Sequence, residues 1–476
     1  MGFAAVIKKY NRSFWVANTI ELFERWAWYG FFMLFANYLT GSADMGGLEF
    51  SQEQKGLIMG IGTGILYFLP VITGAIADKY GYKRVLFIAF FVYTTAFILL
   101  PHFDTFAGVF AMYLYLALGA ALFKPIISAT IAKTTDDETA SIGFGIFYMM
   151  VNIGAFFGPL VTLIYKGQSE LIFYISAGIV ALNFILLLFY KEPDRIVNTD
   201  SIWVSIGKVF TNIAMVLKDF KFVLFLVIVA GFWTMYNQLF FTLPVFIAQW
   251  VDTSAVYNFF HQYLPFFSEN YGIAGTNQME AEFITNFDAM FIIIFQIIVS
   301  TIVMKWRPLR SMMTGFLVCA IGMALTLSTQ NVLFTIVAIY IFAIGEMAGS
   351  PKITEYIGRI APVDKKALYM GYSFIPVFLG NVFAGIISGN VYGAMSDKNV
   401  FVKQEVAEQG IQLADGLTQN EYFNAAAQKM GMTPAELTNQ LWDKYNPSQI
   451  WVVILIIGLV AVLGLFLYDK FLMKRK

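Results

Sequence analysis

Long apolar segments separated by short polar stretches dominate the pattern of this chain. Twelve of these segments are long enough, at roughly 20 to 28 residues, to cross a bilayer as helices. The expected spans are 14–39, 54–78, 84–103, 105–132, 142–166, 169–190, 221–248, 283–304, 308–328, 332–358, 367–393 and 449–471. The pattern therefore predicts an all-α integral membrane protein.

Basic residues gather in the loops on one side of these spans. The segments DKYGYKR, KEPDR, KWRPLR, PVDKK and the terminal KRK fall there, whereas residues 249–283 on the other side contain no lysine or arginine. Because cytoplasmic loops carry the excess of basic residues, we expect both termini in the cytoplasm and the protein in the inner membrane. The N-terminus lacks the short apolar core and cleavage site of a signal peptide, so we expect the first span to be retained.

The spans divide into two groups of six. We expect an N-terminal bundle over 1–190, a cytoplasmic linker over 191–220, and a C-terminal bundle over 221–476. In the linker, apolar residues recur at helical spacing with lysines between them, which predicts an amphipathic helix along the inner membrane surface. Two six-span halves with both ends inside are typical of the major facilitator fold.

Two outer loops are long, over 249–283 and 394–448. In the second, the sequence TPAE at 433–436 has the Thr and Glu spacing of a capping box, with proline at the first helical position. It predicts a small helical cap outside the membrane, which is either a passive surface feature or a site for a protein partner.

The loop between spans two and three reads GAIADKYGYKR, and it resembles the loop signature of the major facilitator superfamily. Asp78 ends one helix, Gly81 permits a tight turn, and Arg84 opens the next helix. An ordinary basic cytoplasmic loop is the alternative. These three residues are therefore candidates for a structural role in gating.

Composition further limits the classes of function that this chain can have. The chain is 58% hydrophobic and 13% charged, whereas soluble proteins have about 25% charged residues. Its 31 basic residues balance 31 acidic ones, so charge indicates no nucleic-acid partner. One cysteine permits neither a disulfide framework nor a thiolate metal site. We see no metal-ligand cluster and no Ser–His pair at depth, and expect a protein that is not an enzyme and has no cofactor or metal.

The first span carries ionisable groups that would be costly in lipid, at about 2.5–3.5 kcal/mol each. Glu21, Arg25 and Trp28 recur at i, i+4 and i+7, flanked by Glu24 and Tyr29, so one helix face holds the charges. We expect that face to line a hydrated cavity. The alternative is a packing salt bridge between Glu21 and Arg25, which we expect would leave Glu24 unpaired.

Three other spans hold isolated charges: Lys124 in span four, Asp288 in span eight and Glu346 in span ten. Lys124 could instead snorkel to the interface, and Asp288 could lie near the outer end of its helix. If all face inward, the first half supplies a cationic wall and the second an anionic wall. A zwitterion such as an amino acid or short peptide fits such a cavity.

Uncharged polar and aromatic residues could line the same space. The candidates are Tyr67, Asn152, Trp233, Asn237 and Gln238. Each has an alternative: tyrosine and tryptophan often anchor helices at the membrane border, and asparagine or glutamine often bonds between helices.

With these residues on the page, the chain resembles the proton-dependent oligopeptide transporter family. The family's first-helix motif Glu-x-x-Glu-Arg-Phe-x-Tyr-Tyr-Gly is similar to ELFERWAWYG, which begins at Glu21. FKPIIS in span four, FYMMVNIGAFFGP in span five, and GEMAGSP with MGYSF and LGN in spans ten and eleven are similar to further family motifs. The chain departs at Asn237, where the family usually has Glu, and at Asp288, where it usually has Asn.

The resemblance implies a role for each candidate. Proton coupling would fall to Glu21, Glu24 and Arg25, and to Asp288 if a carboxylate has moved from span seven to span eight. Substrate binding would fall to Arg25, Tyr29, Tyr67, Lys124, Asn152, Trp233, Asn237, Gln238 and Glu346, and gating or structural roles to Asp78, Gly81, Arg84 and Pro351. Within this set, Arg25 and Lys124 would meet the peptide carboxylate and Glu346 the amine.

We therefore expect a proton-coupled symporter that imports di- and tripeptides by alternating access, driven by the proton gradient. Its partners would be protons, a small zwitterionic substrate and the lipid bilayer. Two alternatives stay open: a transporter of another zwitterionic or anionic solute, such as an amino acid or an amino-sugar peptide, and a non-transporting receptor or assembly subunit.

Overall fold

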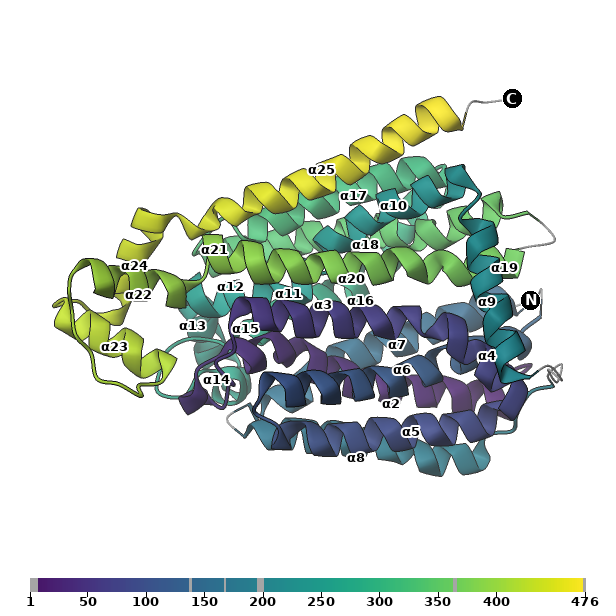
Figure 1. Ribbon diagram of the computed structural model, residues 1–476, viewed down its shortest axis with the longest axis horizontal. Helices are drawn as coiled ribbons and strands as arrows, with labels where there is room; N and C mark the ends of the chain where they lie inside the picture. Colours follow the sequence, from purple (N-terminus) through teal and green to yellow (C-terminus); the bar gives the residue numbers. More distant parts are fainter. Residues whose placement is uncertain (1–6, 137–138, 167, 195–200, 363–365, 474–476) are drawn as a thin grey trace.

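The protein folds as a set of long helices that run side by side along one axis (Figure 1). A computed structural model describes residues 7–136, 139–166, 168–194, 201–362 and 366–473. Ten of the described helices are long and apolar enough to cross a membrane, and a bent helix pair would be an eleventh. The twelfth is α2 (Arg12–Thr40), 29 residues long, which carries three ionisable residues at mid-length. The predicted all-α membrane fold is confirmed.

The first six spans follow the predicted order. They are α2, α3 (Gln52–Phe68) with α4 (Pro70–Tyr80), α5 (Tyr82–Leu99), α6 (Phe106–Lys133), α7 (Ala140–Leu163) and α8 (Ser169–Phe189). The axis bends by 42° between α3 and α4. Pro70 begins α4, and the missing N–H of a proline explains why the helix breaks there.

The remaining spans are more often built from consecutive pieces. They are α10 (Phe220–Tyr236) with α11 (Gln238–Phe241) and α12 (Leu243–Trp250); α15 (Ala281–Thr285) with α16 (Phe287–Val303); α17 (Pro308–Thr326); α18 (Val332–Ile360); α19 (Lys366–Gly371) with α20 (Ile375–Ile386), the π turn η5 (Ile387–Val391) and α21 (Tyr392–Met395); and α25 (Ile450–Leu467).

The two ends of the bundle differ. Helix α2 begins and α25 ends at the same end, which we call the proximal end (Figure 1). Across it lies α9 (Ile202–Val216), in the linker where the sequence predicts an amphipathic helix. Its Trp203 is 79% exposed, as expected of a helix that lies on a membrane surface. Residues 195–200 of the linker lie outside the described residues.

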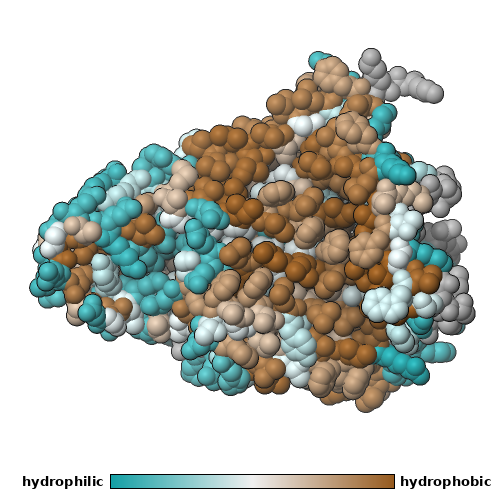
Figure 2. All heavy atoms as spheres, in the orientation of Figure 1, coloured by the Kyte–Doolittle hydropathy of each residue, from teal (hydrophilic) through white to brown (hydrophobic). Residues whose placement is uncertain are grey.

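The opposite, distal end carries a helical cap. It consists of α22 (Lys398–Glu408), α23 (Gln419–Lys429) and α24 (Pro434–Tyr445), with α13 (Ser254–Tyr263) and α14 (Pro265–Tyr271) beside them. The Thr433 side chain accepts from the backbone of Glu436 and the reciprocal bond is also present, so the predicted capping box is confirmed. Figure 2 shows this cap as a hydrophilic region next to the hydrophobic band over the spans.

Helix α3 of the first half packs against α20 of the second near the distal end. A Cβ on Gly56 would lie 2.2 Å from the carbonyl oxygen of Gly385, and one on Gly60 would lie 2.9 Å from the Cα of Gly385. Small residues permit such close approach between membrane helices. The halves therefore meet tightly at the distal end in this structure.

Candidate functional site

The charged face of α2 forms a compact ion-pair cluster. The Arg25 Nε atom lies 3.2 Å from Glu21 Oε1, and its Nη2 lies 2.5 Å from Glu24 Oε2. The Tyr93 hydroxyl on α5 donates to Glu24 Oε1 at 2.8 Å. The expectation that pairing Arg25 with Glu21 would leave Glu24 unpaired is therefore wrong, because the guanidinium presents several donors and bonds both carboxylates.

Lys124 extends this cluster from α6. Its Nζ atom lies 4.9 Å from the centroid of the Tyr67 ring, a distance suited to a cation–π contact. It interacts electrostatically with Arg25, Glu24 and Glu21. Two basic and two acidic side chains therefore share the N-half cluster, and their formal charges cancel.

The second half holds a cluster whose formal charges do not cancel. The Tyr236 hydroxyl donates to Glu346 Oε1 at 2.8 Å, and Asp288 interacts electrostatically with Glu346. Among the described residues, Glu346 Oε2 and Asp288 Oδ1 have no hydrogen-bond partner. Pro351 lies inside α18 one turn beyond Glu346, and the helix continues through it. This C-half cluster therefore holds two carboxylates and no cation among the described residues.

Tyrosines connect the two clusters. Tyr29 on α2 interacts electrostatically with both Arg25 and Glu346. Tyr148 on α7 interacts with Glu346 and Asp288, yet it is 42% exposed. The two halves therefore bring their charges to one region, and a side chain of that region keeps accessible surface.

Sequence reasoning missed three residues of these clusters: Tyr93, Tyr148 and Tyr236. Tyr148 lies within the quoted motif FYMMVNIGAFFGP, and Tyr236 directly precedes the candidate Asn237. Tyr93 meets α2 from 69 positions away, and no local pattern marks it.

The four amide and indole candidates differ in position. Asn152 donates to the Tyr148 carbonyl at 2.8 Å, and the Trp233 ring lies 4.9 Å from that of Tyr236, so both adjoin the clusters. Asn237 is buried, and its Nδ2 lacks a partner among the described residues.

Gln238, in contrast, is fully buried in helix packing. Its Nε2 donates to the Thr234 carbonyl at 2.9 Å, and its Oε1 accepts from the Thr242 hydroxyl at 2.5 Å. Its Nε2 also donates to the Ala384 carbonyl of α20 at 3.4 Å, so Gln238 bonds between two spans, and no described contact joins it to either cluster.

The predicted signature loop lies between α4 and α5. Gly81 has φ 98°, in the region that favours glycine. The Tyr82 hydroxyl donates to Asp78 Oδ1 at 3.2 Å, and Glu192 Oε1 accepts from the Tyr82 backbone at 2.9 Å. Arg84 is exposed. Glu192, which sequence reasoning missed, thus ties the start of α5 to the chain after α8.

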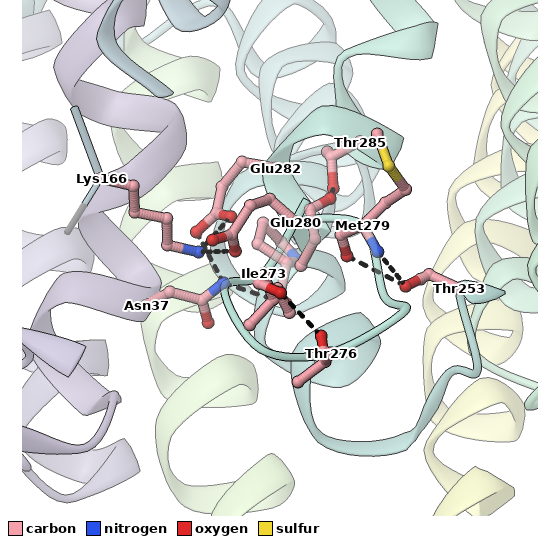
Figure 3. A network of polar contacts seen from close by, with 11 residues as sticks. Asn37, Lys166, Thr253, Ile273, Thr276, Met279, Glu280, Glu282 and Thr285 are labelled. Atoms are coloured by element: carbon pink, nitrogen blue, oxygen red, sulfur yellow. Dashed lines mark hydrogen bonds and ion pairs between the residues drawn. The ribbon is translucent and has the colours of Figure 1, made fainter. Parts of the chain in front are cut away.

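A third polar group joins the halves at the distal end (Figure 3). Lys166 Nζ, after α7, lies 2.5 Å from Glu280 Oε2 and 2.7 Å from Glu282 Oε2. The Asn37 amide on α2 donates to Glu282 Oε1 at 2.8 Å. We call these four residues the distal cluster. Sequence reasoning missed it, because no local pattern pairs residues more than 100 positions apart.

Comparison with known proteins decides the family. The profile of the Major Facilitator Superfamily matches residues 19–385. The chain belongs to this superfamily. The predicted superfamily is thereby confirmed. The superfamily and the fold of this chain are those of transporters that cross the membrane many times.

Among curated relatives, an uncharacterized MFS-type transporter of Bacillus subtilis, YqjV, is 24% identical over 67% of this chain and 73% of its own length. A Na(+), Li(+), K(+)/H(+) antiporter of Planococcus maritimus is 22% identical over 79% of this chain and 88% of its own. The peptide transporter YePEPT of Yersinia enterocolitica is 30% identical, over 30% of this chain and 29% of its own.

Solved structures agree on the fold. A peptide transporter POT in complex with alafosfalin superposes with TM-score 0.66 at 17% identity, over 94% of this chain and 93% of the other. The nucleoside transporter NupG gives TM-score 0.69 at 12% identity, over 96% and 100%. Such identities establish the fold that the two halves share with these transporters and leave the substrate open.

Proposed function

We propose that the chain is a proton-coupled symporter of the peptide-transporter type that imports di- and tripeptides by alternating access. The observation that carries the proposal is the opposition of the two clusters. Arg25 and Lys124 stand on one side. On the other stand Glu346 and Asp288, each with one oxygen that has no partner among the described residues, and Tyr29 interacts across. A short peptide has a carboxylate for the first pair and an ammonium for the second.

Proton coupling would act through the N-half cluster. Arg25 is engaged by Glu21 and Glu24, so a substrate carboxylate would compete with two bound carboxylates for its guanidinium in this state. A proton on either carboxylate would weaken one ion pair and free part of the guanidinium. The substrate carboxylate would then replace the protonated group, which links proton binding to substrate binding.

Under this proposal the protein lies in the inner membrane and its proximal end faces the cytoplasm, because the basic loops lie at that end. The distal cap would face outward, where a protein partner could reach it. The motifs of spans one, four, five and ten support the choice of peptide among zwitterionic solutes. Peptide transporters recur among the relatives and the structural neighbours.

A second candidate, exchange of alkali cations for protons, draws support from one observation. The C-half cluster has two carboxylates and no cation among the described residues, and a named Na(+), Li(+), K(+)/H(+) antiporter is a relative. Carboxylate oxygens are ligands for hard metal cations, so an alkali cation would take the place of an ammonium there.

Uptake into proteoliposomes separates these functions. We expect dialanine to accumulate inside when the outer pH is acidic, and the accumulation to collapse with a protonophore. Uptake that is equal with and without the gradient contradicts proton coupling. Proton release from the vesicles on addition of Na⁺ or K⁺, without peptide uptake, supports the exchanger instead.

A further inference from the structure

A cavity of about 930 Å³ lies at the distal end, where the second half meets the cap (Figure 1). Its walls come from the end of α12, from the loops before α15 and α18, and from α22, α23 and α24 of the cap. Every lining residue belongs to the range 247–442 of the second half, and none is a member of the N-half or C-half cluster. Asp252 on its wall is exposed, so solvent reaches the cavity. Its volume is sufficient for a small organic molecule.

Lys398, the first residue of α22, is the cation among the residues that line this cavity. Its Nζ atom lies 4.3 Å from the centroid of the Phe423 ring and 5.6 Å from the Trp250 ring. Both distances are suited to cation–π contacts. In the described parts of the chain this ammonium has no ion pair and donates no hydrogen bond. The rings therefore hold the ammonium in place and leave its charge without an anionic partner.

Two carboxylates close to this part of the fold are engaged elsewhere. Asp397, which precedes Lys398, caps α22 and accepts from the Gln249 amide at 2.8 Å. Glu280 is a lining residue, and its Oε2 atom lies 2.5 Å from Lys166 Nζ (Figure 3). A half-buried ammonium without an anion is costly, and an anionic ligand would offset that cost. Lys398 therefore favours a ligand that carries a carboxylate.

Asp252 provides the opposite charge on the wall of the same cavity. Its Oδ1 atom accepts from the Gln278 amide at 2.8 Å and from the Ser254 backbone at 2.9 Å. Within the described residues no contact engages its Oδ2 atom. Asp252 follows Trp250, which contacts Lys398, by two positions. The two opposite charges therefore lie on neighbouring parts of the wall, which suits a small zwitterion.

Aromatic rings give the cavity an apolar surface beside these charges. Trp250, Phe423 and Trp442 all line it, and the ring centroids of Trp250 and Trp442 lie 5.8 Å apart at an interplanar angle of 61°. Such rings can cover the apolar side chain of a ligand. The amides of Gln330 and Asn439 also line the cavity and offer donors and acceptors for a peptide group. The lining thus combines a cation, a carboxylate, amides and an apolar surface.

We propose that this cavity is a second binding site for a short peptide, whose carboxylate bonds Lys398, whose amine faces Asp252, and whose apolar side chain packs on Trp442. The choice of a peptide among zwitterionic solutes rests on the function proposed above. Because the second half supplies every lining residue, the site is formed without any residue of the first half. It is separate from the N-half and C-half clusters.

Tryptophan fluorescence of the full chain in lipid nanodiscs reports on this site, because Trp250 and Trp442 line the cavity. The Glu346→Gln background weakens the central site, so that binding in the cavity is observed by itself. The probes are alanyl-phenylalanine and its C-terminal amide, which lacks the carboxylate. We expect a saturable change with alanyl-phenylalanine and at least about tenfold weaker binding of the amide. Trp442→Phe keeps a ring but removes the reporter, so most of the change should be lost.

Lys398→Gln tests the assignment of the carboxylate. In the same background it should bind alanyl-phenylalanine at least about tenfold more weakly and the amide about equally well. Lys398→Arg keeps the cation, so the preference for the free carboxylate should return. Lys403→Gln is the matched control, since Lys403 is exposed on the same helix and does not line the cavity. It should bind both probes as the unmodified background does.

Asp252→Asn tests the assignment of the amine. We expect about tenfold weaker binding of alanyl-phenylalanine and no change for its N-acetyl derivative, which has no free amine. Asp443→Asn is the matched control, since Asp443 is exposed on α24 and is not a lining residue.

Three results would overturn the proposal. One is equal binding of alanyl-phenylalanine with and without Lys398→Gln. Another is an equal loss of binding in Lys403→Gln. The third is a full fluorescence change in Trp442→Phe, which would place the responding tryptophan outside the cavity. If the Lys398 results hold while dialanine uptake is absent, the cavity site stands and the proposed function fails. Uptake without a signal that depends on Trp442 would have the reverse meaning.

Discussion

The N-half and C-half clusters differ in how their charges are satisfied. Arg25 is bonded by two carboxylates of its own helix, whereas Glu346 and Asp288 each keep an oxygen without a partner among the described residues. The first cluster is therefore complete without a ligand, and the second lacks a cation. The difference suggests that the N-half cluster controls the change between states. The C-half cluster, which lacks a cation, would gain more from binding a cationic group of the substrate.

Arg25→Gln should produce the largest effect, because it removes from the N-half cluster the cation that bonds both of its carboxylates. Glu21 and Glu24 would remain buried without their partner, and breaking a buried ion pair costs about 3–5 kcal/mol. We expect a marked fall in the thermal unfolding temperature in detergent and loss of uptake. An unchanged unfolding temperature would mean that the cluster contributes little to stability.

Glu346→Gln should act in the opposite sense on stability. It removes one of two carboxylates that repel each other, so the unfolding temperature should stay equal or rise. Affinity for dialanine should fall about ten- to a hundredfold, since a charged hydrogen bond contributes about 1.5–3 kcal/mol. Isothermal titration checks the affinity, and equal binding by both proteins would remove Glu346 from the site.

Lys124→Gln should show a smaller effect, confined to the substrate's carboxylate. We expect about tenfold weaker binding of dialanine, corresponding to about 1.4 kcal/mol, and little change for dialanine amide. Binding of both ligands measured on one preparation gives the ratio. Equal losses for the two ligands would indicate general damage to the site.

Tyr236→Phe should have the smallest effect. It removes the hydroxyl that donates to Glu346, so the carboxylate loses a fixed orientation at a cost of about 1 kcal/mol. We expect about fivefold weaker binding of dialanine. Tyr148→Phe serves as the comparison, because Tyr148 interacts with Glu346 without a described hydrogen bond to it; a larger loss there would reverse the order.

Local patterns predicted much of the fold. Segment lengths indicated the spans, and TPAE predicted the start of α24. The charges in the middle of the predicted spans indicated the ionisable residues of the N-half and C-half clusters, because a charge in lipid is costly. These signals are carried by neighbouring residues, and a sequence records them directly.

Long-range partners could not be predicted in this way. Glu24 meets Tyr93, and Lys166, which we expected at the end of span five, meets Glu280 and Glu282. Such contacts depend on how helices rotate and pack. For the same reason Gln238 was expected to line the site, although its hydrogen bonds are made within its own span and to the Ala384 carbonyl of α20.

The most direct test of the opposed clusters is competition for dialanine uptake in proteoliposomes under an inward proton gradient, with free dialanine, N-acetyl-dialanine and dialanine amide as competitors. The account predicts that free dialanine competes best in the wild type, and that Glu346→Gln loses only the preference for a free amine. Equal competition by all three ligands in the wild type would contradict it.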